Sequence, residues 1–580
     1  YPECYIIPID GANQSNLQDA AEMVLYLTRN GVKVNLTESS FTYDGVEYPA
    51  GTMIVSMYQA KRSVANGVLY DGTVITEWPV LYSEGITAFN YTRGFDMITC
   101  AEPAAYETIA AACSVSDEWD VSSAFTGVTG EKVILSNASE DSTSAVNALL
   151  QAGKTVSMII SGEDKGSFLC DYADWQSVSK TYLLTGKGVT AAEAPLSLTI
   201  TKAPVIYISG KPADNESGFV KTTLVSGAYQ YNYDRQTIEM LGFTVTDNAA
   251  EADLIIGAAA LDEQALAAVK SGTPYIGYGS NAINSAVSLF AEGELVRETV
   301  DRSAMDALAY VTYPTESLVT ASYVAEGDDI LYGYGAGYFA AIPDGAQVLI
   351  QLDGSKELLE GFLPSSGEHY EDFLNDSVQA IEYHENGLNL VLFANTLTNK
   401  VHQRDEFNFI SNTAFSSLLG DICTGTADSG DNAKALAAAK YTDVNTGDWF
   451  AEAVGSATAK DLLQGNGKGA FLPLSTTDRS ALATVLYRLA GSPEAESANF
   501  SDVADNAWYA DAVNWAASAG VVQGNNGASY PTNALTREQA VVMFYNYAAS
   551  LDLDVSGKAD LSAYTDAARV TGYAPVAMAW

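Results

Sequence analysis

The sequence has few basic residues and no long uncharged apolar run. Its 580 residues include 29 Lys and Arg against 72 Asp and Glu, a formal net charge of −43. Nucleic acids and anionic membrane surfaces are bound through clustered cations, so this balance argues against both as partners. A bilayer-spanning helix needs about 18 consecutive apolar residues. The most apolar window, Leu254 to Val269, is interrupted by Asp262 and Glu263, and we expect no membrane-spanning segment.

Cysteine and histidine are also scarce. The five cysteines form no CxxC pair, and they are Cys4, Cys100, Cys113, Cys170 and Cys423. This spacing argues against a cysteine zinc site and against a disulfide scaffold. We expect buried thiols; one or two disulfides stay open if the protein is exported, with Cys100 and Cys113 as the nearest pair. The three histidines are His369, His384 and His402. They leave little for metal or acid–base chemistry, and we predict no metal ligand in this chain.

An apolar run, a helical pattern and a second apolar run follow one another three times in the N-terminal part. The three copies span residues 5–34, 133–160 and 205–245, and their predicted helices are 17–29, 144–151 and 234–241. A glycine follows each helix, where a left-handed turn costs least. Strand–helix–strand units of this spacing predict parallel sheets with helices on their faces. This part of the chain is therefore expected to belong to the α/β class.

Residues 441–580 repeat a different unit. In each copy an aspartate turn precedes an aromatic residue by six or seven positions: Asp443 with Trp449, Asp502 with Trp508, and Asp566 with Tyr573. We predict that the aspartate caps a helix and that the first aromatic packs inward. A second helix is predicted at 480–489 and at 537–547. Units of two helices bury little alone, so we expect an all-α array of repeats packed on one another.

These C-terminal repeats resemble tandem S-layer homology domains, whose FxDV and WY layout occurs twice here. The family's Thr-Arg-Ala-Glu motif matches Thr536-Arg537-Glu538-Gln539 and Asp478-Arg479-Ser480-Ala481, which both keep the arginine. The resemblance implies noncovalent binding to a pyruvylated secondary polysaccharide of a Gram-positive-type cell wall, and hence an extracellular location. A guanidinium pairs bidentately with a ketal carboxylate. The alternative is that both arginines merely pair with acids at the helix start.

Six residues are our candidates for contact with the wall polymer. They are Trp449, Arg479, Trp508, Thr536, Arg537 and Glu538.

The N-terminal part resembles a second group of proteins through dispersed segments. Residues 44–62, 70–79 and 93–96 are similar to the region that follows the catalytic domain of large bacterial zinc carboxypeptidase-like proteins. Residues 202–419 resemble the glutamine-amidotransferase-like domain of such proteins, through Pro274 to Gly279, Asn389 to Phe393, Arg404 and Asn412. The resemblance implies a catalytic zinc domain upstream of this chain.

Neither active site can be assembled from the residues present. A zinc carboxypeptidase needs HxxE, but Asp372, Gly387 and Asp405 stand three positions after the histidines. Zinc would therefore belong to an upstream domain, and we expect no cofactor here. An amidotransferase needs a nucleophilic Cys on a strand–helix elbow. The comparable turn carries Ser280, which we interpret as a cap of a helix from Ala282; a nucleophilic Ser280 is the alternative.

These patterns predict a multidomain chain of α/β domains followed by helical repeats. The predicted boundaries are 1–120, 121–200 (a small repeat unit), 201–423 (amidotransferase-like, noncatalytic), a linker at 424–440, and repeats at 441–491, 499–552 and 561–580. We expect a segment of a longer exported precursor. It would be a wall-anchored, noncatalytic scaffold for a carboxypeptidase-like domain. A structural surface-layer or adhesion protein, and a hydrolase using Ser280, are the alternatives. The sequence leaves the oligomeric state open, a homo-oligomer included.

Overall fold

The protein consists of two compact units, residues 1–425 and 426–580, and each is described by itself. The computed structural model describes residues 1–423 and 434–580, except for positions within 78–87, 114–126, 192, 212–227, 302–305 and 327–329 and for single positions or adjacent pairs between 435 and 566. Most of the predicted linker at 424–440 lies outside the described residues, as do Trp78, Pro79 and Asp566. No helix in the described part of the chain is long and apolar enough to cross a bilayer.

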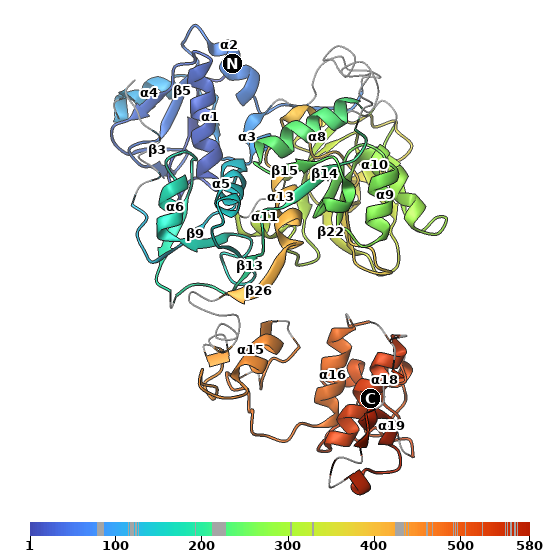
Figure 1. Cartoon of the computed structure of the whole chain (residues 1–580). Helices are drawn as coiled ribbons and strands as arrows, with labels where there is room; N and C mark the ends of the chain where they lie inside the picture. The colour runs from blue at the N-terminus through green and yellow to red at the C-terminus, as the bar shows by residue number, and fades with distance from the viewer. Residues whose placement is uncertain are drawn as a thin grey trace. The chain divides into compact units, whose positions relative to one another are not determined.

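The first sheet has five strands in the order β7-β1-β5-β2-β8. They are β1 (Cys4–Ile7), β2 (Asn35–Thr37), β5 (Met53–Ser56), β7 (Ile98–Cys100) and β8 (Val115–Ser116). Helix α1 (Leu17–Arg29) has its predicted bounds and packs on one face (Figure 1). Every pairing is antiparallel, so the predicted parallel sheet is wrong here. The reason is that β1 pairs with β5 and β7, whereas residues 31–34 form no strand.

The second sheet is also antiparallel, in the order β12-β9-β11-β10-β13-β26. Its strands are β9 (Lys132–Leu135), β10 (Val156–Ile159), β11 (Phe168–Asp171), β12 (Gly186–Val189), β13 (Ser197–Ile200) and β26 (Leu419–Cys423). Helix α5 (Glu140–Gln151) connects β9 to β10, as predicted. The expected parallel pair is wrong because β11 lies between these two strands. Strand β26 joins the sheet edge from more than 200 residues downstream.

The third sheet contains the parallel strands that the sequence predicts. Their order is β15-β14-β16-β17-β25, and they are β14 (Val205–Ile208), β15 (Thr244–Thr246), β16 (Leu254–Gly257), β17 (Tyr275–Tyr278) and β25 (Leu390–Phe393). Helices α8 (Ala228–Met240), α9 (Glu263–Lys270) and α10 (Gly279–Ala286) alternate with these strands along the chain (Figure 1). The sheet continues through antiparallel strands, which are β24 (Val378–Tyr383), β22 (Gln347–Leu352), β19 (Asp306–Thr312) and β23 (Glu360–Phe362). Strand β6 (Val74–Ile75) pairs with β23, so an N-terminal segment also joins this sheet.

Shorter elements complete the N-terminal unit. The strands are β3 (Phe41–Tyr43), β4 (Val46–Tyr48), β18 (Val296–Thr299), β20 (Ile330–Tyr334) and β21 (Gly337–Ala341). The helices are α2 (Arg62–Leu69), α3 (Phe89–Arg93), α4 (Ala105–Cys113), α6 (Tyr172–Val178), α11 (Ala321–Glu326), α12 (Tyr370–Leu374) and α13 (Phe407–Ser416).

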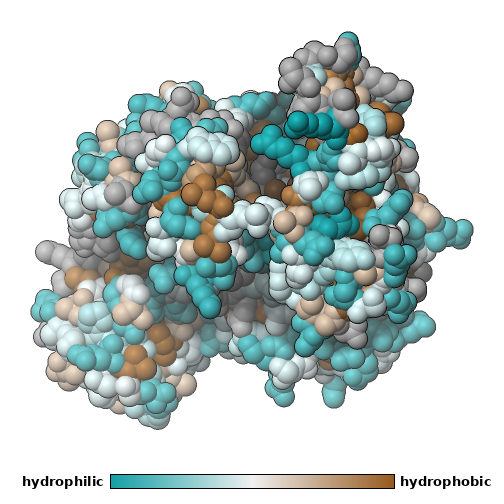
Figure 2. Space-filling view, turned by 90° about the horizontal axis from the view of Figure 1, so that it is seen from below, coloured by the Kyte–Doolittle hydropathy of each residue, from teal (hydrophilic) through white to brown (hydrophobic). Residues whose placement is uncertain are grey.

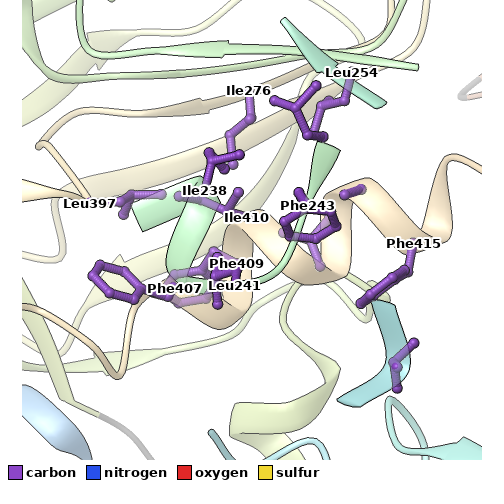
Figure 3. Close-up of a cluster of buried hydrophobic side chains, with 14 of the residues drawn as sticks. Ile238, Leu241, Phe243, Leu254, Ile276, Leu397, Phe407, Phe409, Ile410 and Phe415 are labelled. Atoms are coloured by element: carbon purple, nitrogen blue, oxygen red, sulfur yellow. The ribbon is translucent and has the colours of Figure 1, made fainter. Parts of the chain in front are cut away.

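Helix α13 packs against both the second and the third sheet. Its apolar side chains lie among those of α8, β16 and β17 (Figure 3). The Phe415 ring meets Phe168 of β11 at a centroid distance of 5.2 Å and Phe243 at 5.5 Å. Each fully buried phenylalanine contributes about 2 to 3 kcal/mol of transfer free energy. Because the second and third sheets share this core, they lie within one compact unit.

The C-terminal unit is built from helices. These are α15 (Ala451–Ala459), α16 (Arg479–Leu489), α17 (Ala510–Ser518), α18 (Arg537–Ser550) and α19 (Pro575–Ala579). Helices α16 and α18 lie where the repeat pattern predicts second helices. One apolar core joins α16, α17 and α18 through Leu486, Val513, Trp515 and Met543. The first helix of one repeat therefore packs on the second helix of the repeat before it.

Candidate functional site

The repeat aspartates connect two distant parts of each repeat. The Asp443 carboxylate accepts hydrogen bonds from the backbone N–H groups of Phe471 and Leu472, both at 2.8 Å. Asp502 accepts in the same way from Ser529 at 2.8 Å and Tyr530 at 2.7 Å. The backbone donors lower the pKa of Asp443. The predicted helix-capping role is wrong, because α15 and α17 begin eight residues after these aspartates.

The first aromatic residue of each repeat faces solvent, not the core as predicted. Trp449 is 90% exposed and Trp508 is 69% exposed. The following aromatic packs inward instead, and its ring meets the tryptophan edge-on at 5.6 Å (Phe450) and 5.3 Å (Tyr509). Neighbouring residues at a helix start cannot both face the same side. An exposed tryptophan at a repeated position costs solvation and adds nothing to the core, so its placement suits contact with a ligand.

The third repeat places Tyr573 at the corresponding position, and this side chain is 59% exposed. It was not among our candidates, although the repeat spacing aligns it with the two tryptophans. Figure 2 shows that apolar side chains on one face of the molecule form small separate groups among hydrophilic residues. Small scattered groups of this kind are ordinary on a protein surface, so it is the repeated position of the aromatic residues that indicates a site.

The two arginine motifs form matched helix N-termini. Asp478 caps α16 by accepting from the Ala481 N–H at 2.8 Å. Thr536 caps α18 through a reciprocal capping box with Gln539. The caps satisfy backbone N–H groups that would otherwise lack partners. Arg479 and Arg537 are thus the first residue of each helix, where the positive end of the helix dipole adds to their charge.

The two motif loops lie against each other. A backbone bridge joins Asp478 to Ala534, and the Leu535 N–H donates to the Thr477 carbonyl at 2.8 Å. The Arg479 Nε donates to the Ser529 carbonyl at 3.1 Å. Burial lowers the pKa of Arg479, and Tyr573 of the third repeat lies near enough to oppose part of this shift. The surroundings of Arg479 therefore come from all three repeats.

Arg479 and Arg537 differ in burial but share the lack of an acidic partner. Arg479 is half-buried and Arg537 is exposed. Ion pairs are formed elsewhere by Arg29, Arg235 and Arg404, whereas neither Arg479 nor Arg537 has one among the described residues. The interpretation that they merely neutralise acids at the helix start is not favoured by this geometry.

Glu538 binds within the protein. Its two carboxylate oxygens accept from the N–H of Thr571, at 3.1 Å, and from the Thr571 hydroxyl. This contact joins the second repeat to the third. The six predicted residues thus fall into three groups. Thr536 and Glu538 have hydrogen-bond partners inside the fold. Arg479 is half-buried with one hydrogen bond from its side chain, and Trp449, Trp508 and Arg537 are exposed.

The strand–helix elbow of the N-terminal unit carries a glycine followed by a serine, and no cysteine. Gly279 follows β17 with φ +78° and occupies the bend itself. Ser280 is the second residue of α10 and is exposed; the N-cap is Tyr278, without a side-chain cap, so the predicted capping role of Ser280 is wrong. Two histidines have other partners: His369 contacts Asp372, and His384 contacts Glu382 and Asn389. Within the described residues, no group of three or more His, Cys, Asp or Glu side chains is placed to hold a metal ion.

The buried carboxyl group of Asp234 is hydrogen-bonded to residues next to this elbow. Asp234 of α8 accepts from the Tyr278 hydroxyl at 2.7 Å, the Thr398 hydroxyl at 2.6 Å and the Ala258 N–H at 3.0 Å. Burial raises the pKa of Asp234 to about 6 despite these three donors. The group ties α8 to the carboxyl ends of β16 and β17.

Comparisons with known proteins agree with the repeat geometry. The model of the S-layer homology domain matches residues 440–483 and 499–541. The Surface-layer 125 kDa protein of Lysinibacillus sphaericus is 31% identical over 139 residues, which is 24% of this chain and 11% of that protein. Endo-1,4-beta-xylanase A of Thermoanaerobacterium saccharolyticum is 28% identical over 92 residues, 16% of this chain and 8% of that enzyme. The chain thus spans about a tenth of the length of these relatives.

The two matched repeats are S-layer homology domains, and the predicted location is confirmed: the protein is extracellular and anchored at the bacterial cell surface. Neither the family match nor these two relatives supports a zinc carboxypeptidase or an amidotransferase-like domain in this chain. Among solved structures, the exo-beta-1,4-mannosidase Op5Man5 from Opitutaceae bacterium strain TAV5 is 11% identical and covers 38% of this chain and 36% of that chain, with a TM-score of 0.21. A likeness at this TM-score carries no argument.

Proposed function

We propose that residues 441–580 bind an anionic polysaccharide of the bacterial cell wall and thereby hold residues 1–425 at the cell surface. The observation that carries the proposal is the pair of helix-starting arginines, Arg479 and Arg537, which have no acidic partner among the described residues. A carboxylate or phosphate of the polymer supplies that partner. The S-layer homology of the repeats supports the same class of ligand.

The chemistry of the surface fits such a polymer. A guanidinium binds a carboxylate through two parallel hydrogen bonds, and charged bonds of this kind contribute about 1.5 to 3 kcal/mol each. The chain carries 43 excess negative charges and repels a polyanion at long range. Local cations must therefore supply the attraction. The exposed rings of Trp449, Trp508 and Tyr573 offer flat apolar faces for sugar rings.

A sedimentation assay with purified bacterial cell walls tests the proposal. Arg479→Ala and Arg537→Ala are each expected to weaken binding about tenfold, because each removes at least one charged hydrogen bond. Arg29→Ala is the matched control, since it removes the same charge from a surface ion pair in the N-terminal unit. Walls treated with mild acid to remove ketal-linked pyruvate are expected to bind less. Unchanged binding by both repeat variants would refute the proposal.

For residues 1–425 we propose a noncatalytic role, supported by the glycine at the β17–α10 elbow. We distinguish two forms of this noncatalytic role. A scaffold for an upstream zinc carboxypeptidase-like domain is supported by the resemblance of residues 44–62, 70–79 and 93–96. A structural surface-layer or adhesion component is the other form, and it fits the S-layer homology of the C-terminal repeats.

Peptide mapping and intact mass of the protein from its native source distinguish these two forms. A co-purifying or covalently continuous domain with an HxxE motif and bound zinc would establish the scaffold. Further sheet-and-repeat segments without such a domain would establish the structural role. A hydrolase acting through Ser280 would lose its activity in Ser280→Ala, and we expect no activity to lose.

A further inference from the structure

Two cysteines face each other across adjacent strands of the first sheet. Cys4 of β1 is the direct register partner of Cys100 of β7 in an antiparallel pair. Both side chains are 0% exposed and belong to one apolar cluster, on the face opposite α1. Directly opposed residues in an antiparallel pair have Cα atoms about 4.5 to 5.5 Å apart. This separation lies within the range of about 4.4 to 6.8 Å that a disulfide spans.

The two thiols already interact in the structure. The interaction between the two thiols lowers the pKa of Cys100 and raises that of Cys4. Cys113 and Cys170 are differently placed. Cys113 donates to the Ile109 carbonyl at 3.0 Å within its own helix. Cys170 lies on β11, opposite Val133 and Val156 of its neighbouring strands, in a separate core.

We propose that Cys4 and Cys100 form a disulfide in the exported protein. The extracellular location supplies the redox setting, because disulfides persist outside the cell and thiols persist inside it. In the reaction the two thiols lose two protons and two electrons as the Sγ–Sγ bond forms. The electrons pass to an oxidised disulfide, either a protein oxidoreductase or a low-molecular-weight disulfide, which is reduced to two thiols. The inference does not depend on wall binding.

Burial determines when this bond can form. An oxidant in solvent cannot reach two side chains that are 0% exposed. The bond therefore forms during folding, before the apolar side chains of this cluster cover the two cysteines, and it resists reductants afterwards. It links the fourth residue of the chain to a strand that is 96 positions away (100 − 4). A crosslink that closes so long a loop restricts the unfolded chain strongly.

Thiol counting by mass spectrometry tests the inference on the whole secreted chain. The protein is denatured and alkylated with iodoacetamide, with and without prior reduction. We expect five labels after reduction and three without it, since two of the five cysteines are crosslinked. Peptide mapping is expected to join the peptides of Cys4 and Cys100. Five labels without reduction, or a link from Cys100 to Cys113, would overturn the inference.

Two variants and a refolding experiment sharpen the result. Cys113→Ser is expected to keep the crosslink, whereas Cys100→Ser is expected to lose it and to melt at a lower temperature. Unfolded reduced chain that refolds with oxidised glutathione is expected to gain the crosslink. The folded reduced protein is expected to gain it at least tenfold more slowly, because both thiols are buried. Equal rates would contradict the burial argument, and crosslinking of another pair would contradict the assignment.

Discussion

Leu486 and Phe544 occupy the same position in two helices but differ in burial. Each lies seven residues after the arginine that begins its helix (486 − 479 and 544 − 537). Leu486 is 0% exposed in the core formed by α16, α17 and α18, whereas Phe544 is 43% exposed. Truncation of both side chains to alanine therefore compares a buried and an exposed copy of one repeat position.

The structure predicts unequal costs. Leu486→Ala removes the equivalent of about three methylene groups at about 0.8 kcal/mol each. The cavity left in a closed core raises the cost to about 3 kcal/mol. Phe544→Ala leaves no closed cavity because the ring borders solvent, and we expect about 1 kcal/mol. Both helices keep a residue of high helix propensity at the position.

Hydrogen exchange of the amides of α16 and α17, measured by mass spectrometry on the whole chain, reports the free energy of opening of this unit. Leu486→Ala is expected to accelerate the slowest exchange about 100-fold, and Phe544→Ala less than tenfold. Equal acceleration in the two variants would refute the argument that packing between consecutive repeats stabilises the unit. No acceleration in either would show that the helices are held by other contacts.

Three further predictions concern pH, the exposed aromatics and the third repeat. The pKa of Asp234 is about 6 in the folded chain against 3.8 ordinarily, so between these pH values the folded state holds a proton that the unfolded state has lost. Urea unfolding should therefore show the free energy of unfolding falling by up to about 3 kcal/mol as the pH rises through 6. Asp234→Asn should remove this part of the pH dependence. Trp508→Ala should leave the melting temperature nearly unchanged and weaken wall binding. Trp515→Ala should lower the melting temperature by several degrees, because Trp515 is buried and Trp508 is not. A larger drop in melting temperature for Trp508→Ala than for Trp515→Ala would contradict the assigned orientations. Glu538→Ala should speed amide exchange at Thr571 several-fold, and unchanged exchange there would show that this contact does not hold the third repeat.

Local patterns predicted the helices well and the strand pairing poorly. Helix α1 has its predicted bounds because its apolar spacing and the Asn16 cap are both local signals. The direction of pairing is not local. An apolar run such as β1 fits a parallel or an antiparallel neighbour equally, and the choice is made by β5 and β7, which lie about 50 and 95 residues away. The parallel pairing was correct only where consecutive units are adjacent in one sheet, as in β14 and β16.

The position of the two motif arginines was predicted, but the geometry around them was not. The repeat motif located Arg479 and Arg537 correctly at the helix starts. It could not tell which of two adjacent aromatics faces the core, because Trp449 and Phe450 are both large and apolar. It also could not show that Glu538 is already bound to Thr571. That contact depends on how consecutive repeats pack, which no single repeat encodes.

Strand β26 has a mechanical consequence. It is the last element of the described part of residues 1–425, it lies at the edge of the second sheet, and within the described residues its one partner is β13. With the repeats fixed to the wall, any tension on the N-terminal unit enters the fold through the C-terminal end of β26. The hydrogen bonds between β26 and β13 carry that load before any other part of the sheet does. Flow or growth of the cell surface would therefore peel this edge first and leave the rest of the unit folded under small forces.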